Sequence, residues 1–146
     1  MKVVRFYIVI LFVLIGLCLN GNPFKQDTIK SLNSSIILEI PNRLHYKKTS
    51  QIYSEGQIHI LNFHNQSYIM VTDGGLLKLD TDSIMHLERN VKPNQRSYVG
   101  NKENKYYRKD IISDMIFYYA NVPNEDKLLF DSIFNNIIII PQERIF

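Results

Sequence analysis

Two short apolar runs on either side of a polar turn constrain the fold of this chain most. The runs cover 57–63 and 67–72, and both are rich in β-branched and aromatic residues. Runs of this kind, separated by a short polar loop, are typical of a β-hairpin. Side chains alternate along a strand, so Ile58 faces one side of this hairpin and Leu61 the other. Because both faces carry apolar groups, we expect the hairpin to lie inside a sheet that is covered on both sides.

Weaker patterns predict further strands before and after this hairpin. Each is short, rich in aliphatic residues and bounded by turn-forming residues, and together they place strands at 36–40, 44–48, 76–79 and 137–140. The segment 84–91 is compatible with a strand or a helix. The segment 92–105 has little apolar pattern, so we expect an exposed loop there.

The segment 106–122 carries two competing patterns. Tyr107, Ile111 and Met115 recur at helical spacing, whereas 115–122 is rich in β-formers and is followed by a proline. β-branched and aromatic side chains suit the pleated surface of a sheet. We therefore favour a strand for 115–122.

The segment after Pro123 gives the clearest helix signal. Asn124 is a suitable N-cap, and apolar residues at helical spacing follow it. With one helix over about 124–136 and several short strands, we expect an α+β fold. It is a single small domain over 35–146, in which a mostly antiparallel, twisted sheet is covered by the C-terminal helix. The order of elements is similar to that of small exported domains of the PsbP and Mog1 type, a resemblance that implies a fold and no activity.

The first eighteen residues have the pattern of an export signal. Lys2 and Arg5 precede an uncharged apolar run over 6–19. Fourteen residues span about 21 Å as a helix, which is short against a hydrocarbon core of about 30 Å. A basic start followed by an apolar run of this length is typical of a signal peptide, so we expect the protein to be exported to the periplasm, the cell envelope or the medium.

Cys18, the single cysteine of the chain, lies where this apolar run ends. The stretch 14–18 resembles the lipid-attachment site of bacterial lipoproteins, although Leu17 stands where that family has a small residue. The resemblance implies lipidation of Cys18; ordinary cleavage nearby and retention as an uncleaved anchor are the alternatives. A lone thiol also excludes an intramolecular disulfide. The polar residues 19–34 are expected to form a flexible tether with at most a short helix.

Charge indicates what kind of partner the protein could have. Outside the leader, basic and acidic residues almost balance, which argues against nucleic-acid binding through a broad basic surface. The basic residues cluster in 89–109, whereas the following C-terminal segment is acidic. Such a cluster could face an acidic protein partner or an anionic membrane surface. The candidate partner-binding residues are Arg96, Lys102, Lys105 and Arg108.

The sequence predicts no catalytic residue, metal site or cofactor. The four histidines are not clustered with other ligands, and no nucleophile elbow or glycine-rich phosphate loop is present. An active site assembled from scattered residues would escape this reading. The candidates for such a site are Glu55, His59 and Asp73.

These observations favour a non-enzymatic exported envelope protein that contacts a macromolecular partner. An inhibitor or immunity-type protein directed against a secreted toxin or enzyme is the first alternative, because small size and export suit it equally. An enzyme without a recognisable motif is the second.

Overall fold

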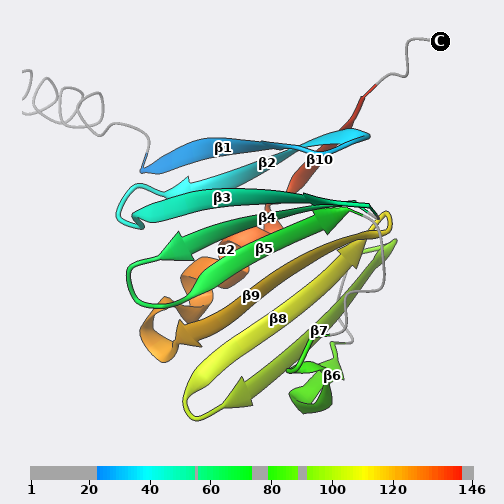
Figure 1. The fold of residues 1–146 in the computed structure, drawn as a ribbon. Coiled ribbons are helices and arrows are strands. Elements are labelled where there is room, and N and C mark those ends of the chain that lie inside the picture. Colours follow the sequence, from blue (N-terminus) through cyan, green and yellow to red (C-terminus); the bar gives the residue numbers. More distant parts are fainter. Residues whose placement is uncertain (1–22, 55, 74–78, 89–91, 143–146) are drawn as a thin grey trace, which may run out of the picture.

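The structure, a computed structural model, describes residues 23–54, 56–73, 79–88 and 92–142. These residues form two antiparallel sheets and one α-helix (Figure 1). The small sheet has the order β1-β2-β10, with β1 Phe24–Lys30, β2 Ser34–Pro41 and β10 Ile138–Pro141.

The large sheet has seven strands in the order β3-β4-β5-β9-β8-β7-β6. Their bounds are β3 Tyr46–Tyr53, β4 Gly56–Phe63, β5 Tyr68–Asp73, β9 Met115–Pro123, β8 Lys105–Ile112, β7 Gln95–Lys102 and β6 Met85–Leu87. The 3₁₀ turn η1 (Asp82–Ile84) precedes β6, and η2 (Asn124–Asp126) leads from β9 into the helix α2 (Lys127–Asn135).

Several expectations from the sequence are confirmed. The expected hairpin is β4–β5, in which Leu61 lies opposite Ile69 and Ile60 opposite Met70. The expected strand 115–122 is β9, and the expected helix is η2 followed by α2. The fold is therefore built mostly from antiparallel strands with one short helix near the C-terminus. No helix among the described residues is both long enough and apolar enough to cross a membrane.

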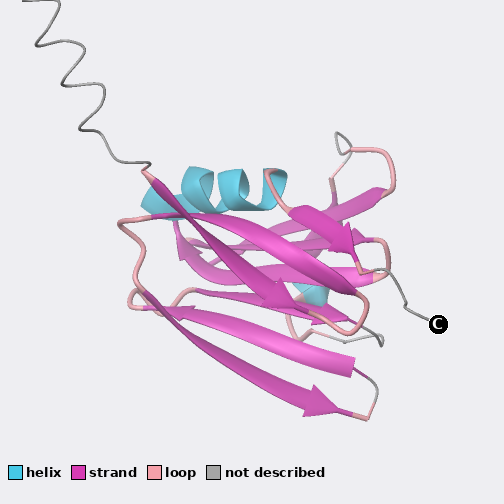
Figure 2. Cartoon of the chain, turned by 90° about the horizontal axis from the view of Figure 1, so that it is seen from above, coloured by secondary structure: helices cyan, strands magenta, loops and turns pink. Residues whose placement is uncertain are grey.

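The main core lies between the inner face of the large sheet, the small sheet and α2, which packs against β2 and β9 (Figure 2). Three T-shaped aromatic contacts join α2 to the large sheet: Phe130 to Phe63 at 5.1 Å, Phe130 to Tyr119 at 5.7 Å and Phe134 to Tyr119 at 5.0 Å between ring centroids. Such pairs add to the stabilisation that burial of the rings already provides.

The flexible tether expected at 19–34 is wrong from Phe24 onward. Residues Phe24 to Lys30 form β1, which pairs with β2 along its whole length, and Ile29 is fully buried. The polar composition hid this strand because Asp27 accepts hydrogen bonds from Tyr46 and Lys48 of β3 instead of facing solvent. The folded domain begins at Phe24, eleven residues before the boundary expected from the sequence.

The expected loop at 92–105 is also wrong. Most of the segment is β7, which pairs with β8 through a tight turn at Glu103 and Asn104, both with positive φ. Sequence pattern missed this hairpin because Ser97 and Asp110, which face the interior, are polar and bond to each other. Within 84–91 the structure contains the short strand β6, and the strand expected at 76–79 falls almost wholly outside the described residues.

The two ends of the molecule differ in what they carry. The N-terminal end, on the left in Figure 1, holds the start of β1, the 42–45 loop, the β4–β5 turn and the β7–β8 turn. The opposite far end holds the β1–β2 turn, the β3–β4 turn and the end of β10. Exposed apolar side chains at the far end include Leu32 and Ile52.

Candidate functional site

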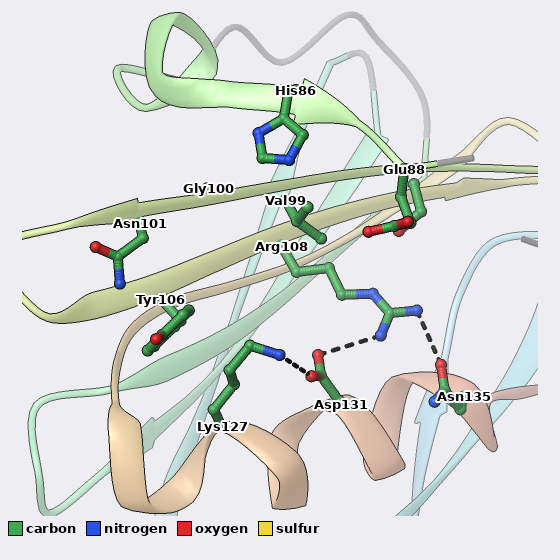
Figure 3. A pocket seen from close by; sticks show the side chains of 11 residues that line it. His86, Glu88, Val99, Gly100, Asn101, Tyr106, Arg108, Lys127, Asp131 and Asn135 are labelled. Carbon is green, nitrogen blue, oxygen red and sulfur yellow. Dashed lines mark hydrogen bonds and ion pairs between the residues drawn. The ribbon is translucent and has the colours of Figure 1, made fainter. Parts of the chain in front are cut away.

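An open cleft of about 460 Å³ lies between α2 and the β6–β7–β8 ribbon (Figure 3). Alternation along β7 and β8 turns every second residue toward the helix, so Val99 and Arg108 face the cleft from opposite positions. Helical spacing places Lys127, Asp131 and Asn135 on one stripe of α2. The lining is completed by His86, Glu88, Ser97, Gly100, Asn101 and Tyr106.

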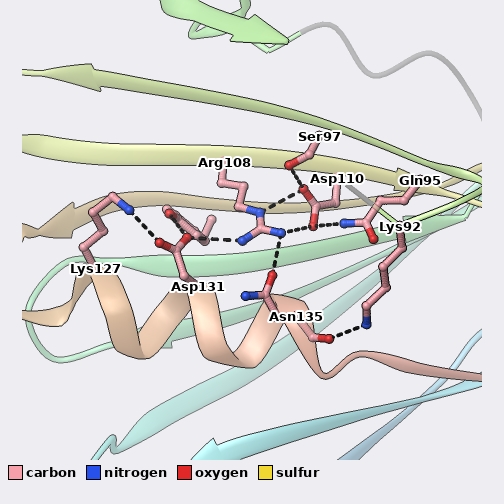
Figure 4. A network of polar contacts seen from close by, with 9 residues as sticks. Lys92, Gln95, Ser97, Arg108, Asp110, Lys127, Asp131 and Asn135 are labelled. Atoms are coloured by element: carbon pink, nitrogen blue, oxygen red, sulfur yellow. Dashed lines mark hydrogen bonds and ion pairs between the residues drawn. The ribbon is translucent and has the colours of Figure 1, made fainter. Parts of the chain in front are cut away.

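Arg108 is the centre of a polar network on the floor of this cleft (Figure 4). Its Nε and Nη2 donate to the two carboxylate oxygens of Asp110, both at 2.9 Å. Nη1 donates to Asp131 at 3.3 Å, and Nη2 donates also to Asn135 at 3.0 Å. A guanidinium that meets a carboxylate with two parallel bonds is held in position and direction, because its fork of donors matches the carboxylate.

The two carboxylates of this network are satisfied by further donors. Asp131 accepts hydrogen bonds from Lys127 at 2.6 Å and from the Tyr119 hydroxyl at 2.8 Å. Burial raises the pKa of Asp131, but the bonds from Lys127 and Tyr119 and the charges of Lys127 and Arg108 outweigh it and leave that pKa below its ordinary value. Tyr119 is buried as well. Its burial, the charge of Asp131 and its hydrogen bond to Asp131 raise the pKa of Tyr119.

Asp110 is fully buried and accepts four hydrogen bonds from three residues. Gln95 Nε2 donates to it at 2.8 Å, and Ser97 adds a second hydrogen bond beside those of Arg108. Each ionised group of the network therefore faces an opposite charge or several donors. Chemically the arrangement is a clamp that fixes α2 to β8, since it leaves neither a base nor a nucleophile free to react.

The structure separates the four predicted partner-binding residues. Arg108 is 8% exposed and belongs to the clamp, where its guanidinium is already paired with Asp110 and Asp131. Arg96, Lys102 and Lys105 lie on the opposite, outer face of the β7–β8 hairpin. Lys102 is directly opposite Lys105 at the tip, whereas Arg96 is six residues further along β7, about 20 Å away.

The cations of the outer face differ in whether they have a partner. Lys109 makes an ion pair with Asp82, and its Nζ lies 5.1 Å from the centroid of the Tyr98 ring. Within the described ranges Arg96, Lys102 and Lys105 make no ion pair. Like charges directly opposite each other across two strands are destabilising, so the tip pair has a cost that a negatively charged partner would remove.

The scattered residues do not form a catalytic arrangement in the part of the chain that the structure describes. Asp73 accepts hydrogen bonds from Ser31, from Leu32 N at 2.9 Å and from Gln57 N at 2.7 Å. These donors belong to the β1–β2 turn and to β4, so Asp73 fastens the small sheet to the large one. Glu55 lies outside the described residues, as does Cys18.

His59 is the remaining candidate and lies on the inner face of β4. Its Nδ1 is 2.8 Å from Ser50 Oγ, and Nε2 is buried with no hydrogen-bond partner among the described residues. Burial lowers the pKa of His59, the Lys48 charge lowers it further, and the Asp73 charge opposes both. The lowered pKa favours the neutral imidazole, and no carboxylate is hydrogen-bonded to the ring in the described structure, unlike the base of a catalytic triad.

Neither a metal site nor the second pocket points to catalysis in the described residues. No group of three or more histidine, cysteine, aspartate or glutamate side chains that could hold a metal ion occurs among residues 23–54, 56–73, 79–88 and 92–142. A smaller pocket of about 330 Å³ on the outer face is lined in part by Tyr68, Tyr107 and Tyr118. The Tyr118 hydroxyl is 2.7 Å from Thr81 Oγ1.

Sequence analysis missed the roles of Asp110, Asp131 and Lys127. The spacing of Lys127 and Asp131 by four residues is a readable signal for an ion pair on a helix. The pairing of Arg108 with Asp110, two apart on one strand, required knowing that 105–112 is a strand.

Comparison of the chain with protein families, with curated proteins and with solved structures found no match.

Proposed function

We propose that this chain is an exported, non-enzymatic binding protein that contacts an acidic partner through the tip of the β7–β8 hairpin. The observation that carries the proposal is the pair Lys102 and Lys105, two cations directly opposite each other with no acid paired to either in the described part of the chain. By contrast, Lys48, Lys109 and Lys127 each contact a carboxylate.

Binding is a better account than catalysis because the charged groups on the floor of the cleft between α2 and the β6–β7–β8 ribbon are paired with one another. Arg108, Asp110, Asp131 and Lys127 are joined by ion pairs in one network. A reacting group needs a free proton-accepting atom or an activated nucleophile within reach of a substrate. The network stabilises the packing of β8 against α2, and the tip of the β7–β8 hairpin contacts the partner.

The export part of the proposal rests on residues 1–18 alone. A basic start and an apolar run too short for a comfortable membrane span favour export, after which the chain is lipidated at Cys18, cleaved nearby or retained. In each case the folded domain works outside the cytoplasm, with the hairpin tip available to the partner.

The experiment is site-specific photocrosslinking in the cells that make the protein. A photoreactive residue replaces exposed Asn101, beside the tip, or exposed Ser54 at the far end. Adducts should form from position 101 and be rare from position 54. K102E/K105E should reduce them about tenfold or more, since each cation near an anionic surface contributes about 1 kcal/mol.

The matched control is K30E/R96E, which changes the charge equally on exposed residues that make no ion pair in the described structure and lie near the far end. It should leave the adducts from position 101 intact. Equal adduct yields in both double variants would show that the hairpin tip is not the contact. The proposal would then be wrong.

A further inference from the structure

The chain joins the folded domain at the same end of the strands as the basic hairpin tip, but beside β3, near the opposite edge of the large sheet. β1 begins at Phe24, and the carbonyl of Pro23 accepts a hydrogen bond from Asn42 N at 2.9 Å, which fixes the chain at that point. Phe24 lies at the N-terminal end of the molecule, as do the β4–β5 turn and the β7–β8 turn (Figure 1).

Little chain separates this point from the apolar leader. Only residues 19–22 lie between Cys18 and Pro23. The five residue steps from Cys18 to Pro23 span at most about 18 Å. If Cys18 or the apolar run stays in a membrane, Pro23 at the start of β1 is held within about that distance of its surface.

Charge at the N-terminal end suits such a position. Lys47 on β3 and Lys102 on β7 lie at this end near opposite edges of the large sheet, and both are exposed. The basic residues here outnumber the acids: Lys25, Arg43, Lys47, Lys102 and Lys105 against Glu103, Glu125 and Asp126. Of these, Arg43 is paired with Asp126, and Lys25 lies over the Tyr46 ring at 4.2 Å.

We infer that the partner is the anionic lipid surface to which the chain is attached, and that the N-terminal end of the domain rests on it. The inference rests on the proposed function, because it names the partner of the same hairpin tip. Short attachment and a surplus of cations act together: the connection keeps the start of β1 near the membrane, and attraction between the headgroups and cations such as Lys47 and Lys102 lays the whole N-terminal end on it, within a field that decays over about 10 Å at 0.1 M salt. A protein partner that grips only the hairpin tip would not sense Lys47, across the sheet.

The test uses the full chain reconstituted through its own N-terminus into vesicles of phosphatidylcholine, with or without about 30% phosphatidylglycerol, a fraction chosen to give a negative surface potential. A fluorescent residue replaces exposed His64 in the β4–β5 turn or Ile52 at the far end, which is 79% exposed. Quenching by neutral acrylamide reports how far each probe is covered.

With phosphatidylglycerol present, the probe at position 64 should be quenched several-fold less than in pure phosphatidylcholine, and 0.5 M salt should abolish the difference. The probe at position 52 should be quenched equally in both vesicles. K47E should lower the equilibrium constant for contact between the N-terminal end and the membrane about fivefold, and so weaken the protection at position 64. K30E, the control at the far end, should leave it unchanged.

The outcomes separate this inference from the proposed function. Equal quenching at position 64 in both vesicles, or equal effects of K47E and K30E, would overturn the lipid inference. If position 101 nevertheless forms adducts with a protein in cells, and K102E/K105E removes them, the proposed function stands with a protein as partner. If neither adducts nor protection depend on the tip cations, both are wrong.

Discussion

Both faces of the β7–β8 hairpin carry basic side chains, but these are paired with acids on the inner face and, among the described residues, unpaired at the tip of the outer face. On the inner face Arg108 is buried and joined to Asp110 and Asp131. On the outer face Lys102 and Lys105 meet each other and no acid within the described structure. Since a charge that is already neutralised gains little from a partner, the difference teaches that charge count alone does not locate a binding surface; the charges left without a partner do.

The largest effect should come from breaking the inner face. Asp110→Asn would leave the buried Arg108 guanidinium without its bidentate carboxylate, and loss of one member of a buried ion pair costs about 3–5 kcal/mol. Denaturant unfolding of the purified protein measures this loss. Asp114→Asn, which removes the same charge from an exposed turn position with positive φ, should change stability by less than about 0.5 kcal/mol. Equal effects of both variants would contradict the clamp.

A smaller effect should appear on acidification. The pKa of Asp131 is lower in the folded protein than the ordinary 3.8 of the unfolded chain, so the ionised form stabilises the fold above that value. This stability should be lost as pH falls below about 4, through the folded pKa. Asp131→Asn should remove part of the pH dependence of unfolding, and Asp73, whose pKa is also lowered, should account for another part. A variant with an unchanged pH profile would show that Asp131 is not stabilised in this way.

The smallest effect on stability should come from the outer face, with the opposite sign. Lys105→Glu replaces a like-charge pair with an opposite-charge pair directly across from Lys102, which should stabilise the hairpin by about 0.2–1 kcal/mol. The same variant should bind its partner less well, because it removes one cation and adds an acid. Thermal unfolding and photocrosslinking from position 101 measure the two effects separately. A variant that is both less stable and fully able to bind would refute the division of roles.

The sequence predicted the elements whose burial is apolar. β4, β5 and β9 show runs of β-formers, and α2 shows an apolar stripe, since all of them contribute Phe, Tyr, Ile or Leu to the core. β1 and β7 were missed because their inward positions include polar side chains that are satisfied across strands. Asp27 with Tyr46 and Ser97 with Asp110 are two such cases.

The candidate site was harder to predict for the same reason. Arg108 and Lys105 stand three residues apart and look alike in a basic cluster. Only the register of β8 shows that one faces α2 and the other faces solvent. The partners that neutralise Arg108 come from the same strand and from a helix more than twenty residues away, so no local pattern announces them.

The most direct measurement compares stability and binding in K102E/K105E. The account predicts an unfolding free energy within about 0.5 kcal/mol of the parent protein, since both side chains are on the surface, together with a loss of crosslinked adducts from position 101. Adduct yields equal to those of the parent, in a variant that is folded and equally stable, would contradict the claim that the hairpin tip is where this protein meets its partner.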